Sequence, residues 1–258
     1  MTAVSPLRVP VLMYHEIAGI ADTPSRLAVA PRAFADQVAY LHDAGFTAIT
    51  AGALAEILAG SQALPERTVV ISFDDGYGDF YSQALPLLKQ YGLTATVFQT
   101  TGLVGVEGTA KRMMNWRELA EAAGAGIEIG AHTHKHPQLD QLPDREMHEE
   151  LSGPKRVLED KLGMAVPGLA YPFGYSNAKV RRAAREAGYT YAYAVDNAMT
   201  TSGSDIFALP RLTIRRTTTM EHFCAMVDGH DTLTLRRDRA LSRAYSVVRR
   251  AKAGLRAA

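Results

Sequence analysis

Short apolar runs rich in β-branched and aromatic residues alternate along this sequence with longer segments of helical period, which restricts the folds open to it more than any other feature. Strands are predicted at 9–14, 46–49, 69–73, 95–98, 126–130, 169–171 and 191–195, and helices at 31–44, 50–58, 79–90, 116–123, 144–162 and 177–187. Thr50 is expected to cap the second helix, and Pro154 to kink or break the fifth. Such an alternation indicates parallel strands covered by helices, as a barrel or as a doubly wound sheet.

Polar side chains follow directly after several of the predicted strands. His15 follows the first strand, the pair Asp74 and Asp75 follows the third, a histidine cluster at 132–136 follows the fifth, and Pro172-Phe173-Gly174 follows the sixth. In α/β barrels the carboxyl ends of the strands form the catalytic face. We therefore expect these segments to converge on one pocket.

The adjacent acids Asp74 and Asp75 need a compensating charge or proton at the mouth of a buried strand, because two buried carboxylates repel each other. One carboxylate and two neutral imidazoles form a reasonable ligand set for a catalytic zinc or a similar ion. The second acid is then free to act as a base. The single cysteine, Cys224, has no motif around it and is interpreted as a packing residue.

Three motifs in this chain resemble those of the polysaccharide deacetylases, which form carbohydrate esterase family 4 with the NodB-homology fold. They are Ser72-Phe73-Asp74-Asp75-Gly76, then His132-Thr133 with His136-Pro137, then Tyr171-Pro172-Phe173-Gly174. The resemblance extends from about residue 9 to residue 213. It implies an α/β fold, a distorted (β/α)7 barrel of the TIM-like kind, as a single catalytic domain.

Transferred residue by residue, the resemblance makes Asp74 the general base and Asp75, His132 and His136 the metal ligands. The backbone N–H of Phe173 would donate to the oxyanion. The implied enzyme is a metal-dependent N-deacetylase of an amino-sugar glycan, an oligosaccharide or a lipid-linked precursor, active in exopolysaccharide biosynthesis, with a metal-bound water as nucleophile. Zinc is the first choice of metal, and iron, cobalt, nickel or manganese also suit these ligands.

The sequence departs from the family pattern in two places. The third motif commonly carries an arginine that pairs with the base, and none is present in Leu169-Ala170-Tyr171. Arg211 is the candidate to supply this charge, with an ordinary surface ion pair as the alternative. The late Leu-x-His motif, which offers a general acid, is not evident. His15 either protonates the leaving amine or only lines the pocket.

Two other functions remain open at this point. The same site suits hydrolysis of another C–N bond, such as deformylation or opening of a cyclic amide. The missing arginine and the missing late histidine also suit a carbohydrate-binding protein whose site has decayed.

The charge distribution separates the chain into a body, 1–235, and a C-terminal tail, 236–258. The tail has eight basic residues and one acid, against 20 basic and 26 acidic residues in the body. As an amphipathic helix this tail would suit an anionic membrane surface, and a solvated or disordered tail is the alternative. Nucleic acid is not expected as a partner, because no recognised module accompanies the basic residues. The N-terminus lacks the pattern of a signal peptide, so we expect a cytoplasmic protein, peripheral at the inner face of the membrane if the tail binds there. The sequence leaves the oligomeric state open.

Overall fold

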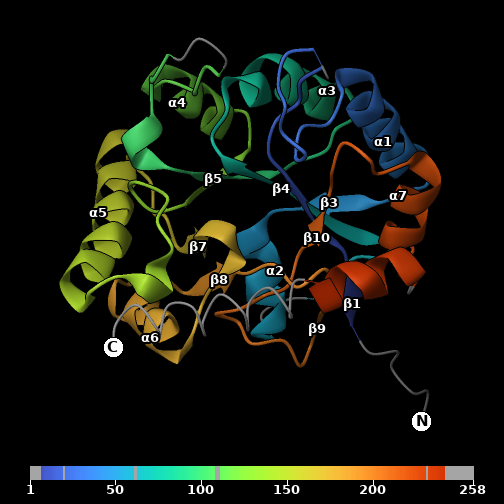
Figure 1. The fold of residues 1–258 in the computed structure, drawn as a ribbon. Helices are drawn as coiled ribbons and strands as arrows, with labels where there is room; N and C mark the ends of the chain where they lie inside the picture. Colours follow the sequence, from blue (N-terminus) through green and yellow to red (C-terminus); the bar gives the residue numbers. More distant parts are fainter. Residues whose placement is uncertain (1–6, 20, 61–62, 108–110, 231, 242–258) are drawn as a thin grey trace.

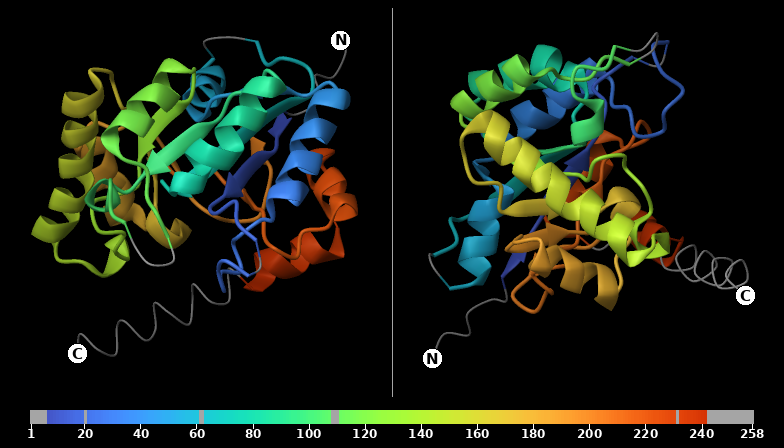
Figure 2. Two further views of the ribbon diagram at one scale, coloured as in Figure 1. Left: turned by 90° about the horizontal axis from the view of Figure 1, so that it is seen from above. Right: turned by 90° about the vertical axis from the view of Figure 1, so that its left-hand side faces the viewer.

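The structure, a computed structural model, describes residues 7–19, 21–60, 63–107, 111–230 and 232–241. Its centre is a curled sheet of parallel strands with helices arranged around the outside (Figures 1 and 2). Among the described residues, no helix has both the length and the apolar character that a membrane crossing requires.

Most elements lie where the sequence predicts them. The strands are β1 (Arg8–Val9), β2 (Val11–Tyr14), β3 (Thr47–Ile49), β4 (Thr68–Asp75), β5 (Thr96–Gln99), β6 (Glu128–Ala131), β7 (Gly168–Ala170), β8 (Tyr191–Tyr193), β9 (Thr200–Thr201) and β10 (Leu212–Thr213). The helices are α1 (Pro31–Asp43), α2 (Ala51–Leu58), α3 (Leu85–Gln90), α4 (Trp116–Gly124), α5 (Asp144–Leu162), α6 (Ala178–Glu186) and α7 (Met220–Val227). Short helical turns are η1 (Phe80–Ala84), η2 (Thr101–Leu103), η3 (Leu139–Gln141) and η4 (Pro172–Gly174).

The strand order makes a distorted barrel. Seven parallel strands follow the order β10-β2-β4-β5-β6-β7-β8, and β3 pairs with the first half of β4. Tyr193 of β8 also forms a parallel bridge with Leu209, in the segment that leads into β10. Because β10 pairs with β2, the residues 209–213 join the two edges of the curled sheet. This arrangement confirms the predicted α/β barrel, and β1 pairs separately with β9.

Two apolar cores follow from the alternation of side chains along the strands. One lies between the outer face of the sheet and the helices, and the other fills the barrel. Phe98 and Tyr193 lie at the centre of the inner core, and α2 packs against it from the amino-terminal end of the strands through Ala51 and Leu54. Gly130 gives room for an aromatic ring, because a Cβ there would lie 2.5 Å from the Phe98 side chain.

Two proline residues lie in helical segments and affect them differently. The predicted helix 79–90 consists of a π-helical turn, η1, followed by α3, in which Pro86 occupies the first turn. Proline has no N–H to donate to the carbonyl four residues earlier, which is why the regular helix starts anew at this point. Pro154, in contrast, does not break α5, which continues from Asp144 to Leu162.

The beginning of the predicted tail is attached to the body of the protein. Residues 233–241 are helical, so this helix crosses the predicted boundary at residue 235. Leu235 is buried, and Asp238 forms an ion pair with Arg215. The rest of the predicted amphipathic tail, 242–258, lies outside the described residues.

Candidate active site

The carboxyl ends of four parallel strands bring the predicted site residues together. His15 follows β2, and Asp74 and Asp75 end β4. The histidine cluster follows β6, and the turn η4 with Phe173 follows β7. These segments are separated by up to about 160 positions in the sequence, and the barrel places them at one end of the sheet, as its topology requires.

Asp75, His132 and His136 form a compact cluster in which one ligand atom of each residue lies within 4.8 Å of the others. The Nε2 atoms of His132 and His136 lie 3.5 Å and 3.4 Å from Oδ1 of Asp75. Burial and the neighbouring His132 lower the pKa of His136, so its imidazole is neutral near pH 7. A neutral ring leaves a lone pair for a cation.

The orientation of His132 fits a metal ligand. Its Nδ1 lies 2.8 Å from the carbonyl oxygen of Ala170, an acceptor, so Nδ1 carries the proton and Nε2 presents its lone pair to the cluster. Metal-binding histidines are usually held in this way by a second hydrogen bond. The donor set of one carboxylate oxygen and two imidazole nitrogens therefore suits a divalent transition metal, with positions left open for substrate and water.

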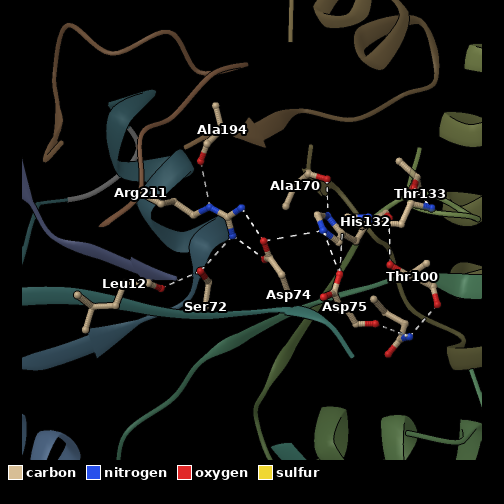
Figure 3. Close-up of polar contacts among 12 residues, drawn as sticks. Leu12, Ser72, Asp74, Asp75, Thr100, His132, Thr133, Ala170, Ala194 and Arg211 are labelled. Carbon is tan, nitrogen blue, oxygen red and sulfur yellow. Dashed lines mark hydrogen bonds and ion pairs between the residues drawn. The ribbon is translucent and has the colours of Figure 1, made fainter. Parts of the chain in front are cut away.

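Asp74 lies between this cluster and Arg211. Its Oδ2 is 3.9 Å from Nε2 of His132, and Figure 3 shows its carboxylate facing the guanidinium. The guanidinium binds both carboxylate oxygens, with Nη1–Oδ1 and Nη2–Oδ2 distances of 2.6 Å and 2.8 Å. Arg211 is fully buried and Asp74 is 3% exposed, which excludes the alternative of an ordinary surface ion pair. Burial alone raises the pKa of Asp74, but Arg211 and His132 outweigh it and hold this pKa well below its usual range.

Arg211 is itself held from several sides. Its Nε donates to the carbonyl oxygen of Ala194, and its Nη1 lies 3.3 Å from Oγ of Ser72. Its guanidinium carbon also lies 5.6 Å and 6.0 Å from the ring centres of Phe98 and Tyr193. Arg211 therefore has a fixed position. Its side chain extends to Asp74 from the segment 209–213, which closes the barrel.

Four residues of the site have a left-handed backbone although they are not glycine. They are Asp75, Thr133, His136 and Phe173, with φ values of 72°, 65°, 58° and 59°. Six non-glycine residues among the described ones have a positive φ, so most of this strain is concentrated at the site. Such residues cost on the order of 1–3 kcal/mol each and persist where the surrounding structure holds them.

Gln99 is a site residue that the sequence analysis does not identify. Its Nε2 donates to the carbonyl oxygens of Asp75 and Thr100, at 3.1 Å and 2.8 Å. A Cβ at Gly76 would lie only 1.9 Å from Oε1 of Gln99, so the amide packs directly against the glycine. Gln99 thus supports the turn that carries Asp75, and a polar residue at the end of a predicted strand is the one signal of it in the sequence.

His15 and Phe173 complete the surroundings of the cluster. Nδ1 of His15 is buried and has no hydrogen-bond partner in the described part of the chain. Burial lowers the pKa of His15, whereas the charges of Asp74 and Asp75 act in the opposite direction. Phe173 lies in the first turn of η4, where a backbone N–H has no partner within the helix.

Comparison with known proteins identifies the family. The family model described as "Polysaccharide deacetylase" matches residues 61–192, which is more than half of the chain. The matched segment contains Asp74, Asp75 and both histidines of the cluster, and it ends before Arg211.

Curated relatives and solved structures agree with this match. YxkH of Bacillus subtilis (strain 168), assigned to the polysaccharide deacetylases, is 29% identical over 81% of this chain and 72% of its own length. The poly-beta-1,6-N-acetyl-D-glucosamine N-deacetylase of Staphylococcus aureus is 29% identical over 64% of this chain and 60% of its own length. The deacetylase PplD of Streptococcus pyogenes shares the fold, with a TM-score of 0.79, 24% identity and coverage of 86% of this chain and 99% of PplD. The chain therefore belongs to the polysaccharide deacetylase family.

Proposed function

We propose that this protein is a metal-dependent hydrolase that removes N-acetyl groups from an amino-sugar glycan. The observation that carries the proposal is the division of work between neighbouring carboxylates. Asp75 lies with two imidazoles in a cluster suited to a cation, and Asp74 is held ionised by a buried arginine. A base beside a metal site is the arrangement that hydrolysis of an unreactive amide needs.

A bound divalent cation would polarise the amide carbonyl of the substrate and acidify a water molecule. Asp75, His132 and His136 would hold this cation. Asp74 would accept a proton from the attacking water, because its low pKa keeps the carboxylate ionised near pH 7. The N–H of Phe173 would donate to the oxygen that gains charge as water adds to the carbonyl carbon.

Cleavage of the C–N bond releases acetate and an amine, which must gain a proton. His15 is our candidate for delivering it, since its Nδ1 has no hydrogen-bond partner among the described residues. Its lowered pKa means that the resting imidazole is neutral, so the proton that it delivers would be the one that Asp74 accepts from the attacking water.

We propose a β-linked poly-N-acetylglucosamine as the substrate class, by analogy with the staphylococcal relative. The aligned segment spans 60% of the length of that relative.

The decisive experiment is acetate release from a panel of N-acetylated and N-formylated sugars of increasing length, with the metal content measured on the same sample. We expect acetate from the acetylated oligosaccharides and a bound divalent metal. Release of formate alone would favour the deformylase alternative. Glycan binding without any hydrolysis by the metal-loaded protein would favour the decayed site.

We also propose that the basic tail binds an anionic membrane surface. Residues 242–258 contain five basic residues and no acid. Each basic residue near such a surface adds about 1 kcal/mol of binding free energy. Deletion of 242–258 should reduce binding to phosphatidylserine vesicles, with neutral phosphatidylcholine vesicles as the control. Equal binding of the full chain and the deletion variant would contradict the proposal.

A further inference from the structure

The cluster of Asp75, His132 and His136 is open to solvent on one side. Asp74 and His132 are 3% and 1% exposed, whereas the side chains of Asp75 and His136 are 14% and 26% exposed. The exposure therefore rises from the buried arginine toward His136. A substrate has to approach from the side of His136.

An aromatic pair lies at this open side. The ring of Phe173 meets the ring of His136 edge to face, with 4.6 Å between the centroids. Phe173 is 50% exposed, one of few large apolar side chains in the described residues with such exposure. Tyr175 is stacked beside it, with centroids 5.8 Å apart and planes inclined by 22°. An exposed apolar surface next to a catalytic cluster is typical of a binding site.

The backbone holds this pair in place at a cost. Phe173 has a φ of 59°, a conformation that is unusual for a bulky residue. Gly174 follows with a φ of 73°, and a Cβ there would lie 2.6 Å from Val195. The turn is thus pressed against the segment after β8, and the aromatic ring projects outward from it. A solvent-exposed ring in a strained turn contributes little to the core, so its position points to a role in binding.

We propose that Phe173 and Tyr175 form a stacking platform for a pyranose ring of the substrate, directly beside the metal cluster. One face of a pyranose with equatorial hydroxyl groups presents only C–H bonds, which pack on an aromatic face while the hydroxyl groups stay in water. The platform lies next to His136, so it would orient the sugar that carries, or adjoins, the acetamido group. This inference rests on the proposed deacetylase function and names the part of the substrate that the site recognises.

The test compares a chito-oligosaccharide or β-1,6-linked N-acetylglucosamine oligomer with a small N-alkylacetamide that has no ring. Tyr175→Ala changes a residue that has no part in the proposed chemistry, and it should lower the ratio of kcat/KM for the oligomer to that for the acetamide severalfold, the effect of removing the buried part of an aromatic ring. The loss should appear mainly in KM, and Tyr175→Phe should retain the ratio.

A direct binding measurement separates this inference from the proposed function. Calorimetry with the deacetylated oligomer should give a weaker Kd for Tyr175→Ala than for the unaltered protein, whether or not hydrolysis occurs. An equal loss on both substrates, or an unchanged Kd, would overturn the platform. Failure of the unaltered protein to release acetate from any oligomer would instead overturn the proposed function.

Discussion

Two polar layers lie inside the barrel, one near each end of the strands, with the apolar layer of Phe98 and Tyr193 between them. Each layer contains a carboxylate. At the carboxyl ends, Asp74 is paired with the buried cation of Arg211. At the amino ends, Glu128 accepts hydrogen bonds from the hydroxyl groups of Tyr191 and Thr96, at 2.6 Å and 2.7 Å, and from the N–H of Gly52, at 3.0 Å.

The two layers differ in how completely their polar groups are satisfied. Glu128 forms no ion pair with a described basic residue, and its donors include the first turn of α2, whose N–H groups have no helical partner. Among the described residues, the catalytic layer contains an unpartnered His15 nitrogen, a cluster suited to a cation and four of the six non-glycine residues with a left-handed backbone. A half-buried carboxylate surrounded by donors therefore serves stability at one end, whereas a fully buried ion pair beside a strained cluster serves reactivity at the other.

Removing a ligand from the catalytic layer should have the largest effect. We expect His132→Ala to lose the metal and the deacetylase activity together. The loss of metal affinity should exceed the roughly 10–100-fold that a missing outer-shell partner costs. Metal analysis after dialysis and acetate release on the same sample measure both.

His134→Ala is the matched control for this variant. His134 belongs to the same loop, but its Nδ1 lies 3.1 Å from Oγ1 of Thr101, and it is not a member of the cluster. The His134→Ala variant should keep its metal and its deacetylase activity. Full metal occupancy in His132→Ala would remove this residue from the ligand set.

Asp74→Asn should remove the general base and leave the metal site intact. The amide cannot accept a proton, so acetate release should fall about 10²–10⁴-fold. The metal should remain, because Asp75 and both histidines are unchanged. Near-normal turnover would show that another group is the base, and loss of the metal would show that Asp74 is needed to hold it.

Arg211→Met should lower the unfolding free energy and shift the pH dependence of kcat/KM. Removing one partner of a buried ion pair leaves a buried charge and typically costs about 3–5 kcal/mol of unfolding free energy. Chemical denaturation of the metal-free protein measures this loss at pH 7.

The direction of the pH effect follows from the lowered pKa of Asp74. The stability from this group is present above the pKa of an unfolded aspartate, about 3.9, and is lost as the pH falls toward the folded pKa. Without the guanidinium the pKa of Asp74 rises, so the acidic limb of kcat/KM should move to higher pH in Arg211→Met. An unmoved limb would mean that Arg211 does not keep the base ionised.

Most of the fold could be predicted because strand and helix periods are local properties of the sequence. The convergence of Asp75, His132 and His136 also follows, since parallel strands place their carboxyl ends together. The contact between Arg211 and Asp74 joins residues 137 positions apart. This contact depends on how the segment 209–213 closes the barrel. The sequence therefore shows that the arginine of the third motif is absent, but it indicates Arg211 only as a candidate replacement.

The amino-terminal layer could not be foreseen for a related physical reason. Glu128 is the first residue of β6. Only the register of β5 against β6 and the position of α2 show that its carboxylate meets Thr96 and Gly52. The role of Gln99 is equally hidden in the sequence, because it depends on the lack of a side chain at Gly76.

Glu128→Gln should have the smallest effect and should affect stability alone. The substituted amide keeps the shape of the side chain, and its NH₂ group can donate to the Tyr191 hydroxyl, so only the charge-assisted strength of these hydrogen bonds is lost and unfolding free energy should fall by about 1 kcal/mol. Glu128 lies on the far side of the Phe98 and Tyr193 layer from the cluster, so kcat/KM and metal content should stay unchanged. Thermal unfolding and acetate release measured on one preparation test both statements. A fall in kcat/KM at full metal occupancy would mean that the two layers are coupled through the apolar residues between them, and the separation of stability from reactivity would then not hold.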